Sequence, residues 1–131
     1  HSRILSFGPP TTFVMALIDM PVQEKICSEE GVLCGLAEVE DRRSFGSSSW
    51  DKQMIVLRPN GCLLIYKTPE IGRIVHLNEL YRISITMKRK TLNVELTSGK
   101  KEKVTRLRFE GELVPIWGAK LFLYKISLPG L

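Results

Sequence analysis

The sequence has few of the residues that build metal centres or disulfide scaffolds. Its 131 residues include only two histidines and three cysteines, Cys27, Cys34 and Cys62. An odd and low number of cysteines argues against a secreted disulfide scaffold, and two histidines leave too few ligands for a four-coordinate zinc site. We therefore interpret the cysteines as buried or idle thiols in a reducing cytosolic setting, and we expect no metal and no cofactor.

Long apolar runs are also missing. The best candidate, residues 13–20, falls far short of the roughly 20 apolar residues that a membrane span needs, and it contains Asp19. The same run lacks the basic leader and the small-residue cleavage site of a signal peptide. Because the chain length suits one domain, we expect one cytoplasmic globular domain that meets membranes only at their surface.

Catalytic signatures are absent as well. The sequence contains no Gly-x-Ser-x-Gly, no His-Glu-x-x-His and no glycine-rich phosphate loop. His76, the only interior histidine, lies on an expected strand and is most simply structural, and Ser47–Ser49 have no recognisable base. No nucleic-acid fingerprint or aromatic stacking platform accompanies the cations. These absences argue against an enzyme and against a nucleic-acid partner, and they favour a binding module.

What the chain does contain is a series of short strands separated by turns. The clearest hairpin spans residues 52–67, where Pro59-Asn60-Gly61 supplies a turn that tolerates positive φ. Ile83 and Ile85 alternate with polar residues, as in a strand with one buried face, and residues 92–96 repeat the pattern. About seven such strands predict a β-sandwich or barrel.

The ends of the chain differ from this strand-rich centre. We expect residues 1–30 to be an N-terminal extension or linker. Within the strand-rich centre, we expect residues 40–50 to form a polar loop. Near the C-terminus, apolar residues recur on one face of a helix: Leu113, Trp117, Leu121 and Tyr124. A strand over residues 121–128 is the competing interpretation of this segment.

Two stretches resemble the pleckstrin-homology family. DKQMIVLRPNGCLLIYK at 51–67 is similar to the family's second and third strands, and residues 104–126 are similar to its last strand and capping helix, with Trp117 at the tryptophan position. The resemblance covers residues 31–128. It implies a mainly β fold, a seven-stranded bent antiparallel barrel or sandwich capped by one C-terminal α-helix, with Trp117 in the core and no catalytic activity. Phosphotyrosine-binding-like domains share this barrel, so the resemblance does not distinguish between these two kinds of domain.

Lipid-binding members of the family hold phosphoinositide phosphates with a lysine on the first strand and a basic-x-Arg triplet that opens the second. This sequence departs from that pattern, because the first strand carries Glu38 and Glu40 and the triplet position reads Asp51-Lys52-Gln53. Several cations must converge to bind clustered phosphates. The remaining lipid-binding candidates are Arg42, Arg43 and Lys52 near the first loop, and Lys88, Arg89 and Lys90 in a later turn.

These observations predict a non-catalytic targeting module of a larger signalling, trafficking or cytoskeletal protein. The net charge of +5 and the predicted pI near 9.3 favour anionic partners. Our first hypothesis is that the module binds phosphoinositide or phosphatidylserine membranes with low specificity. The alternative is a protein-protein adaptor that does not bind phosphoinositides. Phe45 and Trp50 are candidate anchors for a partner or a membrane, although Trp50 packing against the barrel explains its pattern equally well.

Overall fold

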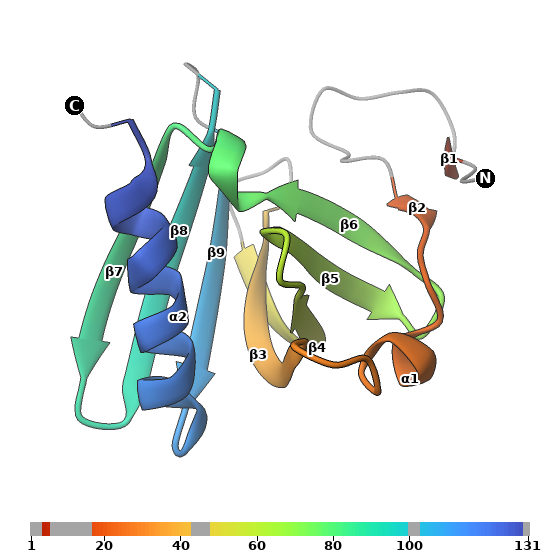
Figure 1. The fold of residues 1–131 in the computed structure, drawn as a ribbon, viewed down its shortest axis with the longest axis horizontal. Coiled ribbons are helices and arrows are strands. Elements are labelled where there is room, and N and C mark those ends of the chain that lie inside the picture. Colours follow the sequence, from red (N-terminus) through yellow and green to blue (C-terminus); the bar gives the residue numbers. More distant parts are fainter. Residues whose placement is uncertain (1–3, 6–16, 43–47, 100–102, 130–131) are drawn as a thin grey trace.

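A computed structural model describes residues 4–5, 17–42, 48–99 and 103–129. Within these ranges the chain forms one antiparallel sheet whose strand order is β1-β2-β6-β5-β4-β3-β9-β8-β7 (Figure 1). The strands are β1 (Ile4–Leu5), β2 (Leu17–Asp19), β3 (Leu33–Arg42), β4 (Ser48–Leu57), β5 (Cys62–Thr68), β6 (Ile71–His76), β7 (Arg82–Lys88), β8 (Thr91–Ser98) and β9 (Lys103–Glu110). The helical segments are α1 (Gln23–Ile26), the 3-10 turn η1 (Leu77–Glu79) and α2 (Leu113–Ser127).

The predicted seven-stranded, helix-capped architecture is confirmed by β3 to β9 and α2. The sheet also contains β1 and β2, which belong to the expected N-terminal extension, so the described strands number nine instead of seven. The predicted loop at 40–50 is too long, because β3 runs to Arg42 and β4 begins at Ser48. The pairing between β3 and β4 therefore extends through polar residues whose composition resembles that of a loop.

The sheet bends sharply between β3 and β9. β3 pairs with β4 over ten residues, from Leu33↔Leu57 to Arg42↔Ser48, but pairs with β9 only at Glu38↔Arg108 and Val39↔Leu107. The chain thus forms two half-sheets that meet at this short seam, and α2 lies along β7, β8 and β9 (Figure 1). The main core fills the space between the half-sheets and the helix, and it includes Trp117.

The C-terminal helix is confirmed, and the competing strand over residues 121–128 is wrong. Trp117 and Leu121 are fully buried, as the helical spacing predicted. Gly118 costs helix propensity, but it has a packing role, because a Cβ at this position would collide with Met87 of β7. Gly35 similarly leaves room for the Trp117 indole, whose Nε1 would lie 2.7 Å from a Cβ at residue 35.

Part of the N-terminal extension packs against the outer face of the first half-sheet. Met20 and Ile26 are buried in a second apolar cluster with Val56, Leu64 and Tyr66. β2 pairs with β6, and the Tyr66 hydroxyl donates a 2.7 Å hydrogen bond to the Pro21 carbonyl. The described part of the extension is therefore attached to the barrel by backbone, side-chain and apolar contacts.

The interpretation of the cysteines as three idle thiols is wrong for two of them. Cys27, which follows α1, and Cys34 of β3 are joined as a disulfide, with their Cα atoms 6.1 Å apart. Cys62 remains a free thiol. The cysteines therefore no longer support a reducing compartment. Among the described helices, none is long and apolar enough to cross a membrane.

Replacing Tyr66 by phenylalanine is expected to lower the free energy of unfolding by about 1 kcal/mol near neutral pH, because the hydrogen bond to Pro21 is lost. Burial raises the pKa of the Tyr66 phenol above its usual 10.0. A raised pKa in the folded state stabilises the protein below the unfolded-state pKa, and this contribution is lost as the pH rises through the folded-state value.

The difference in stability between wild type and Tyr66→Phe should therefore narrow above about pH 10. Denaturant unfolding between pH 7 and pH 11 measures it. Tyr81→Phe, at a half-exposed position, is the control for removing a tyrosine hydroxyl outside the contact with Pro21. A constant difference across this range would mean that the phenol does not titrate differently in the folded state.

Candidate functional site

The predicted cations lie in separate parts of the sheet. One row of paired residues crosses it: Lys52, Glu38, Arg108, Asn93 and Thr86. Arg42 lies four residues from this row along β3, and Lys88 lies two residues from it in the other direction along β7. At about 3.3 Å per residue, Arg42 and Lys88 are on the order of 20 Å apart along the strands, whereas Lys52 lies in the row itself and is separated from β7 by β3, β9 and β8. The structure therefore does not bring them into one site.

At the first end, the predicted residues do not form a cationic pocket. Arg42 closes β3, while Arg43 and Phe45 lie outside the described residues. Lys52 is exposed on β4 directly across from Glu38. The acidic residues that replace the family's cations are thus part of the sheet next to the expected phosphate site.

The nearby arginines of β9 are engaged by those same carboxylates. Arg108 Nε donates to Glu38 at 2.9 Å, and Arg106 donates to Glu40 and Glu95, each at 2.7 Å. Hydrogen bonds to Glu95 and then Glu40 raise the pKa of Arg106 above its ordinary value. Because both guanidinium groups are internally paired, neither is placed to bind a phosphate.

Sequence reasoning missed a further cation near this end. Lys67 of β5 lies 3.9 Å from the Asp51 carboxylate, and both side chains are about half exposed. Such an exposed pair contributes little to stability, but it neutralises a lysine that would otherwise favour an anion. Only the sheet register reveals the pair, because the two residues lie on different strands.

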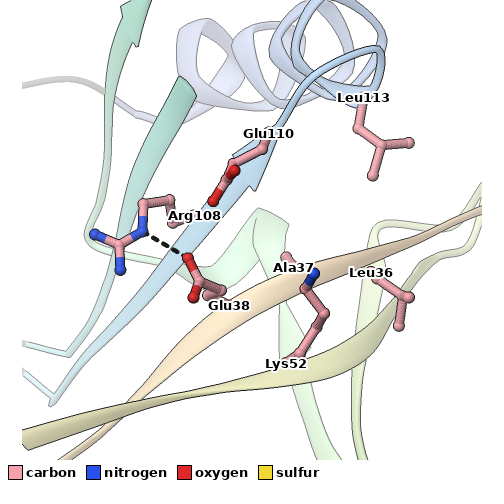
Figure 2. A pocket seen from close by; sticks show the side chains of 7 residues that line it. All are labelled: Leu36, Ala37, Glu38, Lys52, Arg108, Glu110 and Leu113. Atoms are coloured by element: carbon pink, nitrogen blue, oxygen red, sulfur yellow. Dashed lines mark hydrogen bonds and ion pairs between the residues drawn. The ribbon is translucent and has the colours of Figure 1, made fainter. Parts of the chain in front are cut away.

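A shallow pocket of about 160 Å³ opens beside the seam between β3 and β9 (Figure 2). Its lining residues are Leu36, Ala37, Glu38, Lys52, Arg108, Glu110 and Leu113. Two carboxylates offset its two cations, and the ion pair between Arg108 and Glu38 crosses its wall (Figure 2). The pocket therefore has no net charge to attract a phosphorylated headgroup. Among the described residues, no group of His, Cys, Asp or Glu side chains is placed to hold a metal ion.

Trp50 lies on β4 with one face of its ring against Arg108 of β9. The Arg108 guanidinium carbon lies 4.1 Å from the centre of the Trp50 ring, and the side chain is half-buried. A cation–π contact of this kind contributes about 0.5–1 kcal/mol at an exposed site. The ring is therefore covered on one face and is poorly placed to anchor a partner.

Trp50→Ala is accordingly expected to change vesicle binding by less than about twofold, while removing the cation–π contact with Arg108. Co-sedimentation with anionic vesicles measures the first effect and denaturant unfolding the second. A large loss of vesicle binding without a loss of stability would restore Trp50 as a membrane anchor.

The second end carries a cluster of exposed cations in and around the turn between β7 and β8. Lys88 ends β7, Arg89 and Lys90 form the turn to β8, and the Lys90 carbonyl accepts a 3.1 Å hydrogen bond from the Gly111 amide just before α2. α2 adds Lys120 and Lys125, both exposed. None of these five cations forms an ion pair with a described carboxylate.

The β7–α2 side, defined here as residues 80–94 and 113–129, carries the excess positive charge of the chain. It holds six cations, the five above and Arg82, and no acidic residue. Since the whole chain has a net charge of +5, the remaining residues together carry −1. Sequence reasoning selected Lys88, Arg89 and Lys90 but missed Lys120 and Lys125, although the absence of Asp and Glu around them was a visible signal.

Comparison with known proteins agrees with this architecture. A search of the curated proteins finds no match to the chain. A family model described as a PH domain matches residues 20–121, which is most of the chain and includes Met20 and Ile26 of the packed extension. The barrel, the capping helix with its buried Trp117 and this match together place the chain in the pleckstrin-homology domain family.

Proposed function

We propose that this domain is a non-catalytic targeting module that binds anionic membranes with low headgroup selectivity. Lys88, Arg89 and Lys90 would make the principal contacts, and Lys120 and Lys125 would add to the attraction. The single observation that carries the proposal is the concentration of unpaired, exposed cations on the β7–α2 side. Each cation near an acidic leaflet contributes about 1 kcal/mol.

Low selectivity is supported by the state of the family's usual lipid site. A stereospecific grip on a phosphoinositide needs cations that converge on the phosphates. Here Glu38 pairs with Arg108, Glu40 with Arg106, and Asp51 with Lys67. An exposed turn with three flexible cations attracts negative charge but has no rigid geometry with which to tell headgroups apart.

A protein partner is the second candidate function, and one observation favours it. β7 is the last strand in the sheet order, so one of its edges is unpaired within the described sheet, and it lies beside α2 (Figure 1). An extended peptide can add to such an edge as a further strand. This reading predicts binding that survives high salt and depends on peptide sequence.

Vesicle co-sedimentation tests the membrane proposal. Neutral vesicles are compared with phosphatidylserine vesicles and with vesicles of each phosphoinositide, adjusted to the same surface charge. We expect no binding to neutral vesicles, similar binding to all anionic ones, and a steep loss between 0.1 and 0.5 M salt, at about the ionic strengths where screening takes hold. Selective binding to one phosphoinositide at matched charge would contradict low selectivity, and no binding at physiological salt would leave the protein partner.

A further inference from the structure

α2 has a second apolar face that the barrel does not cover. Its buried face consists of Val114, Trp117, Gly118 and Leu121. On the solvent side, four large apolar side chains are 51–61% exposed: Ile116, Phe122, Leu123 and Ile126. A helix of a water-soluble domain normally carries polar residues opposite its buried face, and one that is apolar all round is normally buried. The outer face of α2 therefore lacks the polarity expected of a surface that meets only water.

These exposed side chains form a continuous stripe. Ile116, Leu123 and Ile126 recur at helical spacing with Ala119 between them, and Phe122 borders the row. At 1.5 Å rise per residue, the stripe from residue 116 to residue 126 is about 15 Å long. Met87 of β7, which is 54% exposed, packs beside the helix at Gly118 and adds apolar surface next to the basic turn.

Cations lie at one margin of the stripe and near both ends of the helix. With about 100° of rotation per residue, Lys120 falls on one margin of the stripe, next to Ile116, whereas Lys125 falls on the side of the buried face and is exposed near the C-terminal end of the helix. Lys88, Arg89 and Lys90 lie close to the N-terminal end of the helix, where the Gly111 amide meets the Lys90 carbonyl. α2 contains no acidic residue. The surface is thus apolar along the stripe and has Lys120 at its margin, while the exposed Glu112 precedes the helix beside the basic turn.

This charge pattern decides between two occupants of the stripe. In a symmetric dimer through the stripe, Lys120 of one copy would approach Lys120 of the other, with no carboxylate on the helix to pair with it. An anionic bilayer fits both features, because its headgroups attract the lysines while its interfacial region accepts apolar side chains. Charge complementarity therefore favours the bilayer.

We propose that α2 is a membrane-penetrating element, whose stripe from Ile116 to Ile126 enters the interfacial region of an anionic bilayer. The helix lies in the membrane plane with Lys120 at the level of the headgroups. This inference rests on the proposed function. It adds that α2 enters the bilayer to a defined depth and in a defined orientation, which electrostatic attraction alone does not require.

A tryptophan placed in the stripe reports whether penetration occurs. Leu123→Trp is made in a Trp50→Phe background, so that the other tryptophan is Trp117, which is fully buried. Phosphatidylserine vesicles with brominated acyl chains should quench this variant strongly. Val22→Trp in the same background, at a 45% exposed position on the extension, should bind the vesicles without quenching. Binding without quenching at residue 123 would overturn the penetration but leave the proposed function standing.

A second variant pair measures the contribution of the stripe to binding. Phe122→Ser/Leu123→Ser should weaken vesicle binding at 0.3 M salt by on the order of tenfold per side chain. Leu36→Ser, at a 49% exposed position on β3, is the control and should bind like wild type. Failure of the wild type itself to bind anionic vesicles would overturn both proposals. A wild-type dimer that the double variant converts to a monomer would assign the stripe to contacts between copies and overturn the penetration.

Discussion

Replacing Lys88, Arg89 and Lys90 together by alanine is expected to weaken binding to phosphatidylserine vesicles by about a hundredfold, because each cation near an acidic leaflet contributes about 1 kcal/mol. The three side chains are exposed, and none is ion-paired with a described carboxylate. Their removal should leave the fold intact for the same reason. Co-sedimentation or calorimetric titration with vesicles measures the loss, and circular dichroism checks the fold.

A charge-matched variant separates local contact from general attraction. Lys25→Ala/Arg58→Ala/Lys67→Ala removes the same three charges from residues outside the β7–α2 side, on α1, the turn after β4, and β5. We expect this variant to weaken vesicle binding only severalfold, because its residues lie away from the bilayer and screening limits their influence to about 8–10 Å. Equal losses in the two variants would mean that net charge, and no particular surface, governs binding.

Trp117→Ala is expected to lower the free energy of unfolding by about 3–5 kcal/mol, the range observed when a buried aromatic side chain is removed from a core. Trp117 is fully buried and stacks on Phe109, with the ring centroids 4.7 Å apart and the planes 20° apart. The residue also joins α2 to both half-sheets, since the main core spans them. Denaturant unfolding with a two-state fit measures the change.

Trp117→Phe is the matched comparison. Within the described structure, the buried Trp117 Nε1 has no hydrogen-bond partner, so removing the indole nitrogen breaks no hydrogen bond. Phenylalanine keeps an aromatic ring against Phe109 and should cost clearly less than alanine. Equal costs for the two variants would show that the indole nitrogen makes a contact that stabilises the fold, and a negligible cost for alanine would contradict the position of Trp117 in the core.

Local sequence patterns predicted most of the barrel. The Asn60-Gly61 turn fixed the β4–β5 hairpin, because Gly61 adopts a positive φ of 89° that few residues tolerate. Period-two alternation located β7 and β8, and the spacing of Trp117 and Leu121 located α2. Each of these signals acts over a few residues and needs no knowledge of distant partners.

Features that depend on pairing across the sheet could not be predicted in the same way. The Arg108–Glu38 contact joins residues 70 positions apart, and it decides both the state of the usual lipid site and the position of Trp50. The pairing of Cys27 with Cys34 and the burial of Ile26 against the outer face of the sheet likewise depend on how the extension folds back. Composition identified these residues but gave no information about their partners.

The most direct test of the account asks which side of the domain meets the bilayer. Amide resonances of the domain bound to phosphatidylserine nanodiscs are recorded with and without a spin-labelled lipid, which broadens signals near the membrane. We predict broadening at the turn between β7 and β8 and along the outer face of α2, at Lys88, Arg89, Lys90, Leu123 and Ile126. Broadening concentrated at Trp50, Asp51 and Lys67 instead would place the bilayer at the usual end of the barrel and contradict the account.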